Sequence, residues 1–194
     1  MVELFNKHKL RNGLDIFLGI DIAADYFYKD ERYVLKDKVR PLKRDEYIEY
    51  LLHLIQVYSL LVVEDPLAQD DWDGWKQLSS KLSENVYVIG DNFLSGNTER
   101  FTKSFAEKTC TTVSLKPIEI GTISEVMQLV QAARSVNASY VVSHCLGETD
   151  DTFIADLAVA VQADFVKFGA PSRGERVVKY NRLWTIEREE FTKK

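Results

Sequence analysis

The chain of 194 residues suffices for one domain with a sizeable core and only marginally for two. Its content of 45% hydrophobic and 28% charged residues is typical of a soluble globular protein, and its net charge of −5 argues against a nucleic-acid-binding surface, which is normally basic. The apolar runs are too short to cross a membrane, and the charged N-terminal segment contains no secretory signal. We therefore expect a cytoplasmic protein without nucleic-acid or membrane partners, in which Cys110 and Cys145 stay reduced.

Short β-branched runs alternate with helix-period segments, and no linker or low-complexity tract interrupts them after residue 15. From the second run onward they recur about every 25–28 residues, too far apart for tight hairpins. This alternation predicts βα units with a parallel sheet. Residues 1–15 are expected to be the remnant of a preceding helix, and residues 16–194 to form the domain that contains the sheet. The predicted strands are Ile16–Ala23, Leu60–Glu64, Val86–Asp91, Thr111–Lys116, Tyr140–His144 and Asp164–Phe168.

Segments between these runs carry helix and hairpin signals. Phe27–Leu35 alternates around a polar turn and predicts a small hairpin after the first strand. Asp45–Ser59 has one apolar stripe at helical spacing, and Thr122–Glu125 is a capping-box sequence that opens a second helix. The buried face of that second helix is expected to consist of Ile123, Val126, Met127 and Val130. The chain is expected to end in a charged helix, Arg176–Glu190.

Each predicted strand ends in a titratable side chain. For any one of them a solvated strand end is the simpler interpretation, but six in succession favour a functional site. In a parallel α/β sheet these ends lie on the same side, and in a barrel they meet at one mouth, where catalysis takes place. The candidate residues, in chain order, are Asp21, Glu64, Asp91, Lys116, His144 and Lys167.

The side chains at these strand ends fit together chemically. Asp21, Glu64 and Asp91 offer the hard oxygen ligands that Mg²⁺ prefers. Zinc fits less well, because His144 is the only imidazole among the candidates. A lysine that faces the metal is destabilised as an ammonium ion, which lowers its pKa and allows it to act as a general base. Together these groups predict proton abstraction next to a carboxylate, with Mg²⁺ stabilising the enediolate.

These residues and their neighbours closely resemble enolase, and every block of the resemblance falls in the family's order. The resemblance implies an α/β fold, an incomplete TIM-type (β/α) barrel with the six parallel strands of the enolase C-terminal domain. It also implies a carbon–oxygen lyase of glycolysis, which converts 2-phospho-D-glycerate to phosphoenolpyruvate. The segments that carry it are Gly19–Ala24, Val63–Trp72, Ile89–Asn92, Leu115–Thr122, Ser143–Leu157 and Lys167–Asn181. The implied roles are Mg²⁺ ligation by Asp21, Glu64 and Asp91, general-base catalysis by Lys116, and substrate binding by His144 and Lys167.

Three departures from the enolase pattern lie close to these residues. Cys145 and Leu146 stand where the family has Arg-Ser, which holds the substrate phosphate. Asn92 replaces an Asp, and Pro117–Glu119 replaces Val-Asn-Gln. Such changes resemble those of the divergent, sperm-associated branch of vertebrate enolases. Loss of a guanidinium group removes a bidentate phosphate contact, which predicts weaker substrate binding.

A complete (β/α)₈ barrel takes about 250 residues, and the six predicted strands fall two short of it. The resemblance implies that the N-terminal domain, the first two barrel strands and the glutamates that assist as general acid lie outside this chain. We therefore expect the fragment alone to be inactive. We also expect it to form a homodimer or a larger assembly through open sheet edges, or to fill the gap with its own N-terminal residues.

Two functional hypotheses remain open. The first is an active lyase, which the three carboxylates and both lysines favour. The second is a catalytically impaired pseudoenolase that acts as a structural or assembly protein, which Cys145 and Leu146 favour. A third possibility, another acid dehydratase of the enolase superfamily, is disfavoured by the close match of the motifs.

Overall fold

The computed structural model describes residues 1–191, so the predicted domain end at residue 194 lies outside the described part of the chain. The chain divides into two compact units. Unit 1 comprises Met1–Leu94 with Thr102–Thr111, and unit 2 comprises Ser95–Phe101 with the residues from Thr112 onward. Helix α4 (Thr98–Glu107) therefore contributes residues to both units.

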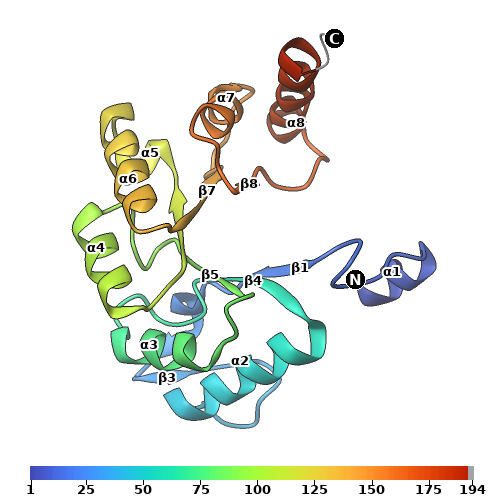
Figure 1. The fold of residues 1–194 in the computed structure, drawn as a ribbon. Coiled ribbons are helices and arrows are strands. Elements are labelled where there is room, and N and C mark those ends of the chain that lie inside the picture. The colour runs from blue at the N-terminus through green and yellow to red at the C-terminus, as the bar shows by residue number, and fades with distance from the viewer. Residues whose placement is uncertain (192–194) are drawn as a thin grey trace. The chain divides into compact units, whose positions relative to one another are not determined.

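Unit 1 contains three parallel strands in the order β1-β4-β5. Helix α2 precedes β4, and helix α3 connects β4 to β5 (Figure 1). The apolar stripes of both helices are buried, which is what the spacing of their apolar residues predicts. The bounds are β1 (Leu18–Asp21), β4 (Leu60–Glu64), β5 (Tyr87–Gly90), α2 (Arg44–Tyr58) and α3 (Trp72–Lys81).

The predicted hairpin between the first strand and α2 is confirmed. A 3₁₀ turn, η1 (Ala24–Phe27), leads into β2 (Tyr28–Lys29), which pairs antiparallel with β3 (Arg32–Tyr33). Tyr33 is fully buried and stacks on Tyr47 of α2, with ring centroids 3.9 Å apart. This aromatic contact fixes the hairpin against the helix.

The N-terminal end of the chain contains a short helix, α1 (Val2–Lys7). Phe5 is buried, whereas Leu4, Leu10 and Leu14 are exposed. The proposed division of the chain after residue 15 stays a prediction.

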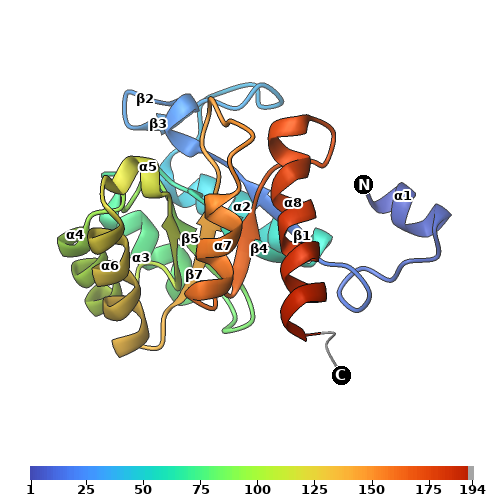
Figure 2. The ribbon, with the colours of Figure 1, turned by 90° about the horizontal axis from the view of Figure 1, so that it is seen from above.

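Unit 2 contains three further parallel strands in the order β6-β7-β8. Helices α5 and α6 connect β6 to β7, helix α7 connects β7 to β8, and α8 follows β8. Helices α7 and α8 lie side by side (Figure 2). The bounds are β6 (Thr112–Leu115), β7 (Ser139–Ser143), β8 (Phe165–Lys167), α5 (Pro117–Ile120), α6 (Ile123–Ser135), α7 (Phe153–Ala160), α8 (Gly174–Ile186) and the π-helical turn η2 (Glu187–Phe191).

The capping box predicted for α6 is present, since Thr122 and Glu125 exchange backbone and side-chain hydrogen bonds. The buried face differs from the prediction in part. Ile123 is 46% exposed and Met127 is 36% exposed, whereas Leu129 is fully buried. The helix is therefore rotated slightly, so that the stripe with Val126 at its start faces inward.

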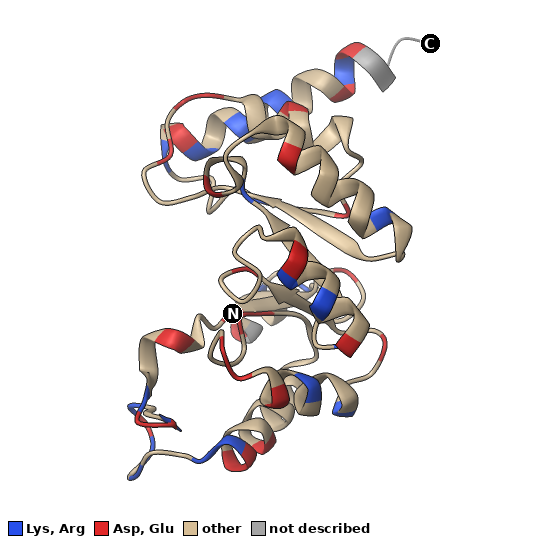
Figure 3. Ribbon diagram, turned by 90° about the vertical axis from the view of Figure 1, so that its left-hand side faces the viewer, with Lys and Arg blue, Asp and Glu red and all other residues tan. Residues whose placement is uncertain are grey.

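All six predicted strands are present, and each is parallel to its neighbours within its unit, which confirms the predicted α/β fold class. Lys and Arg residues are interspersed with Asp and Glu residues along the C-terminal helix rather than segregated from them (Figure 3). Among the described residues, no helix combines the length and the apolar character needed to cross a membrane.

Candidate functional site

The unit 1 sheet brings the three predicted carboxylates to the carboxyl ends of neighbouring strands. The register pairs Asp21 at the end of β1 directly with Glu64 at the end of β4. Glu64 in turn pairs with Ile89 of β5, and Asp91 follows two residues later. Glu64 and Asp91 are buried, with exposed fractions of 3% and 8%, whereas Asp21 is exposed.

The side chains at this edge do not form a closed ligand set. Within residues 1–191, no three Asp, Glu, His or Cys side chains are grouped closely enough to hold a metal ion. Like charges repel, so three carboxylates gain nothing by converging unless a cation lies between them. The donor set nevertheless fits Mg²⁺, because all three groups are hard oxygen donors and Mg²⁺ accepts few protein ligands. The assignment of Asp21, Glu64 and Asp91 as ligands stays a prediction.

A cavity of about 310 Å³ opens beside the same edge of the unit 1 sheet. Its lining includes Asp25 and Tyr26 from the turn after β1, Gln69 from the loop after β4, and Asn92 next to Asp91. These groups are polar or amphipathic, so the edge offers space for a polar ligand.

The sequence analysis missed Asp65, which organises this edge. Its carboxylate accepts hydrogen bonds from the backbone amides of Asp91 at 2.9 Å, Asn92 at 2.8 Å and Phe93 at 3.4 Å. Its own amide donates to the carbonyl of Ile89 at 3.1 Å. Asp65 therefore sets the position of the Asp91 backbone relative to Glu64, its neighbour in the chain. The sequence signal was the second acidic residue directly after the strand.

Burial raises the pKa of the Asp65 carboxyl to about 6. The hydrogen bonds from the backbone amides of Asp91 and Asn92 oppose this rise, and the negative charge of Asp91 adds to it. The carboxylate form is the one that accepts all three amide hydrogen bonds, so the arrangement of the edge depends on the charge of Asp65.

A second buried carboxylate fixes the loop between β4 and α3. Asp71 caps α3 by accepting a hydrogen bond from the amide of Gly74 at 3.1 Å. It also accepts hydrogen bonds from the Tyr33 hydroxyl at 3.3 Å and from Arg44 Nε at 3.0 Å. Trp75 stacks on Phe93 nearby, with ring centroids 4.0 Å apart.

In unit 2 the two predicted substrate-binding residues, His144 and Lys167, are joined by hydrogen bonds to the backbone carbonyl of Lys167. The amide of His144 donates to the carbonyl oxygen of Lys167 at 2.9 Å, and Nδ1 of the ring lies 2.7 Å from the same oxygen. A carbonyl oxygen only accepts, so His144 Nδ1 carries a proton, and Nε2 is the nitrogen left for a ligand. Both residues are half-buried at the carboxyl ends of β7 and β8.

The predicted base, Lys116, has a carboxylate partner that the sequence analysis assigned no function. Its Nζ lies 3.4 Å from Glu119 Oε1, and its side chain is 12% exposed. The thiol of Cys145 donates to the same carboxylate oxygen at 3.6 Å. Two of the departures from the enolase pattern, at positions 119 and 145, are therefore in direct contact. Both cysteines are reduced thiols, as expected; Cys145 is half-buried and Cys110 is buried in unit 1.

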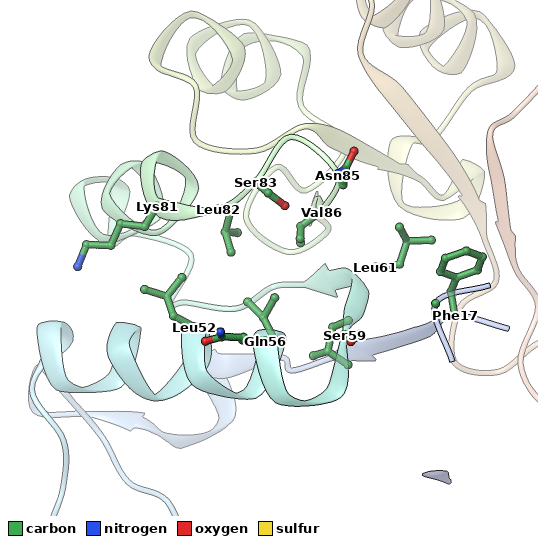
Figure 4. A pocket seen from close by; sticks show the side chains of 13 residues that line it. Phe17, Leu52, Gln56, Ser59, Leu61, Lys81, Leu82, Ser83, Asn85 and Val86 are labelled. Carbon is green, nitrogen blue, oxygen red and sulfur yellow. The ribbon is translucent and has the colours of Figure 1, made fainter. Parts of the chain in front are cut away.

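A separate cavity of about 540 Å³ lies at the opposite edge of the unit 1 sheet (Figure 4). It is lined by Phe17 before β1, Leu61 at the start of β4, Val86 before β5, and Leu52 and Gln56 of α2. This edge holds the amino ends of the strands, so the cavity is not part of the carboxylate site.

The family of this chain follows from its similarity to known proteins. The family described as "Enolase, C-terminal TIM barrel domain" matches residues 3–194. An enolase from Acidothermus cellulolyticus is 41% identical over 189 residues, which cover 97% of this chain but 44% of the relative's own length. The chain thus spans less than half of that relative, and this bacterial similarity gives no support to the predicted affinity with sperm-associated vertebrate enolases. The chain belongs to the enolase family, within the C-terminal TIM barrel domain.

Proposed function

We propose that the full-length protein is an enolase-type lyase, which dehydrates 2-phospho-D-glycerate to phosphoenolpyruvate in cytoplasmic glycolysis and requires Mg²⁺. The observation that carries the proposal is the register of the unit 1 sheet. It pairs Asp21 with Glu64 and lets Asp91 follow the next strand, in a chain of the enolase family. One carboxylate at each of three successive strand ends is a donor set suited to Mg²⁺.

In this proposal Asp21, Glu64 and Asp91 hold the metal ion. When bound, Mg²⁺ supplies positive charge that stabilises the negative charge developing on the substrate carboxylate. The chain itself holds two of the ligands in place. Asp65 follows Glu64 directly and accepts the amide hydrogen bond of Asp91.

Lys116 is the proposed base, and its Nζ takes the proton from the carbon next to the substrate carboxylate. The substrate hydroxyl leaves as water with a proton from the general acid, which the resemblance to enolase places outside this chain. The transfer requires a neutral amine, whereas a carboxylate 3.4 Å away favours the ammonium form. Glu119 therefore opposes proton abstraction as the contact stands. His144 Nε2 and the charge of Lys167 are the proposed groups that bind the anionic substrate.

The test is a rate measurement on the full-length protein with 2-phospho-D-glycerate. Phosphoenolpyruvate formation is followed by ultraviolet absorbance, with Mg²⁺ and after its removal by a chelator. We expect activity only with Mg²⁺, and we expect Lys116→Ala to lower kcat by about 10²- to 10⁴-fold because the general base is lost. Lys108→Ala, which removes an exposed lysine in unit 1, is the matched control and should leave kcat unchanged.

If the unmodified full-length protein shows no activity with Mg²⁺, the lyase proposal fails, and the alternative of a pseudoenolase with a structural or assembly role is favoured. Equal rates for Lys116→Ala and Lys108→Ala would remove Lys116 from the role of base.

A further inference from the structure

Helix α8 carries a lysine whose charge lies in the interior of unit 2. Lys179 is 1% exposed, although lysine is among the residues least often fully buried. A buried ammonium ion is tolerated only where protein groups replace its hydration. Its three N–H groups have three acceptors: Thr149 O at 2.7 Å, Glu175 O at 2.8 Å and Glu148 Oε2 at 2.5 Å. Two of these acceptors belong to the loop between β7 and α7.

The Glu148 carboxylate also contacts a residue next to the proposed substrate-binding residues. Its second oxygen, Oε1, accepts a hydrogen bond from the backbone amide of Cys145 at 3.1 Å. Cys145 directly follows His144, whose amide and Nδ1 both contact the carbonyl oxygen of Lys167. Polar contacts therefore run from the Lys179 ammonium ion through Glu148 to the Cys145 amide, and the chain itself links Cys145 to His144, which contacts Lys167.

We propose that Lys179 is a positioning residue: its buried ammonium ion orients Glu148, which holds the loop after β7 and thereby the ring of His144. Because Lys179 is inside the unit, it acts on substrate only through this loop. The inference rests on the proposed function in one respect: it assumes that His144, which the loop after β7 holds in place, binds substrate. The position of the loop can be measured without substrate, so a failure of this inference and a failure of the proposed function are distinguishable.

The same helix pair offers a matched control. Arg182 of α8 forms a two-pronged ion pair with Asp156 of α7, at 2.6 and 3.1 Å. This pair joins α8 to α7 and not to the loop of Cys145–Thr149. Arg182→Met and Lys179→Met each remove one cation from α8, and only the second removes the contact with Glu148.

The experiment uses nuclear magnetic resonance on the 194-residue chain. Its three histidines allow the ring nitrogens of His144 to be followed against His8 and His53 as internal references. In the unmodified chain we expect the His144 ring to show the Nδ1–H tautomer. In Lys179→Met we expect that signature to be lost, and exchange of the Cys145 amide with solvent to accelerate at least about ten-fold. Arg182→Met should leave both unchanged.

An unchanged His144 signature in folded Lys179→Met, or an equal change in Arg182→Met, would overturn the inference. Glu148→Gln provides a second variant if Lys179→Met fails to fold. It keeps an acceptor oxygen for the Cys145 amide but removes the charge that pairs with Lys179, so the same loss of the His144 signature is expected. If Glu148→Gln retains the unmodified signature and amide exchange, Lys179 has no positioning role.

Discussion

Cys145 and Leu146 occupy the two positions after His144 where the enolase pattern has an arginine and a serine. Leu146 is 97% exposed, and the Cys145 thiol contacts the carboxylate of Glu119. A thiol is at most a weak hydrogen-bond donor and an alkyl group is none, so neither replaces a guanidinium fork as a partner for a phosphate dianion. The carboxylate of Glu119 adds negative charge beside Lys116 and Cys145. At the scale of single residues the proposed site therefore keeps its proposed base, while positions 145 and 146 offer no guanidinium or hydroxyl group.

This arrangement predicts that Cys145→Arg together with Leu146→Ser raises kcat/KM of the full-length protein for 2-phospho-D-glycerate by at least about ten-fold, since one charge-assisted contact is restored. The measurement is steady-state kinetics with Mg²⁺. Leu146→Ser alone, which adds a hydroxyl but no charge, is the control and should gain less. Glu119→Gln in the same background removes a carboxylate that competes with phosphate for the new arginine. No gain over a high initial activity would show that another group already binds the phosphate.

The helices of this chain differ in how they begin. Helix α6 begins with a complete capping box, in which the Thr122 hydroxyl accepts from the amide of Glu125 at 3.2 Å and the Thr122 amide donates to the Glu125 carboxylate at 3.1 Å. Helix α7 also begins after a threonine, Thr152, but that side chain makes no capping hydrogen bond. The two helices therefore allow the energy of a cap to be measured with the same residue type in the same unit.

We expect Thr122→Ala to lower the free energy of unfolding by about 1 kcal/mol. The Glu125 amide loses its acceptor, and the Glu125 carboxylate loses the hydroxyl that helps to hold it near the amide of residue 122. Thr122→Ser keeps the hydroxyl and should recover most of the loss. Thr152→Ala is the matched control and should change stability by a few tenths of a kcal/mol at most, within the range of ordinary surface changes of about 0.5 kcal/mol. Urea denaturation followed by circular dichroism gives all three values. Equal losses for the two alanine variants would show that the Thr122 cap contributes nothing.

At the scale of the whole molecule, each unit presents a strand at the edge of its parallel sheet. β1 pairs with β4, and β8 pairs with β7. Ile20 of β1 is 40% exposed and Val166 of β8 is 39% exposed. Exposed apolar edges with unsatisfied backbone groups tend to pair with another chain. The proposed homodimer or larger assembly has this physical basis.

We predict that the 194-residue chain is a dimer or larger in solution, measured by light scattering coupled to size exclusion. Ile20→Lys with Val166→Lys places a charge on each edge strand and should shift the chain to a monomer, since charged edge residues oppose strand pairing. Val57→Lys, on the exposed surface of α2, is the control and should leave the assembly intact. A monomeric unmodified chain would contradict the prediction.

The six strands, the limits of α2 to within one residue, and a titratable residue at or next to each strand end could all be predicted from the amino-acid sequence. These features follow from local periodicity and spacing, which a single chain displays without knowledge of its packing. The resemblance to enolase added the candidate roles of those residues, and the family comparison agrees with it.

The polar groups that support the candidate site could not be predicted in this way, because their contacts join distant parts of the chain. Asp65 and Asp91 are 26 residues apart, and Lys179 and Thr149 are 30 apart, so no local pattern joins them. Lysine is normally a surface residue and tryptophan is highly buried on average, yet Lys179 is 1% exposed and Trp184 on the same helix is 58% exposed. The inversion has a physical reason: a buried ammonium ion is stable only where packing supplies three acceptors, and those come from the fold.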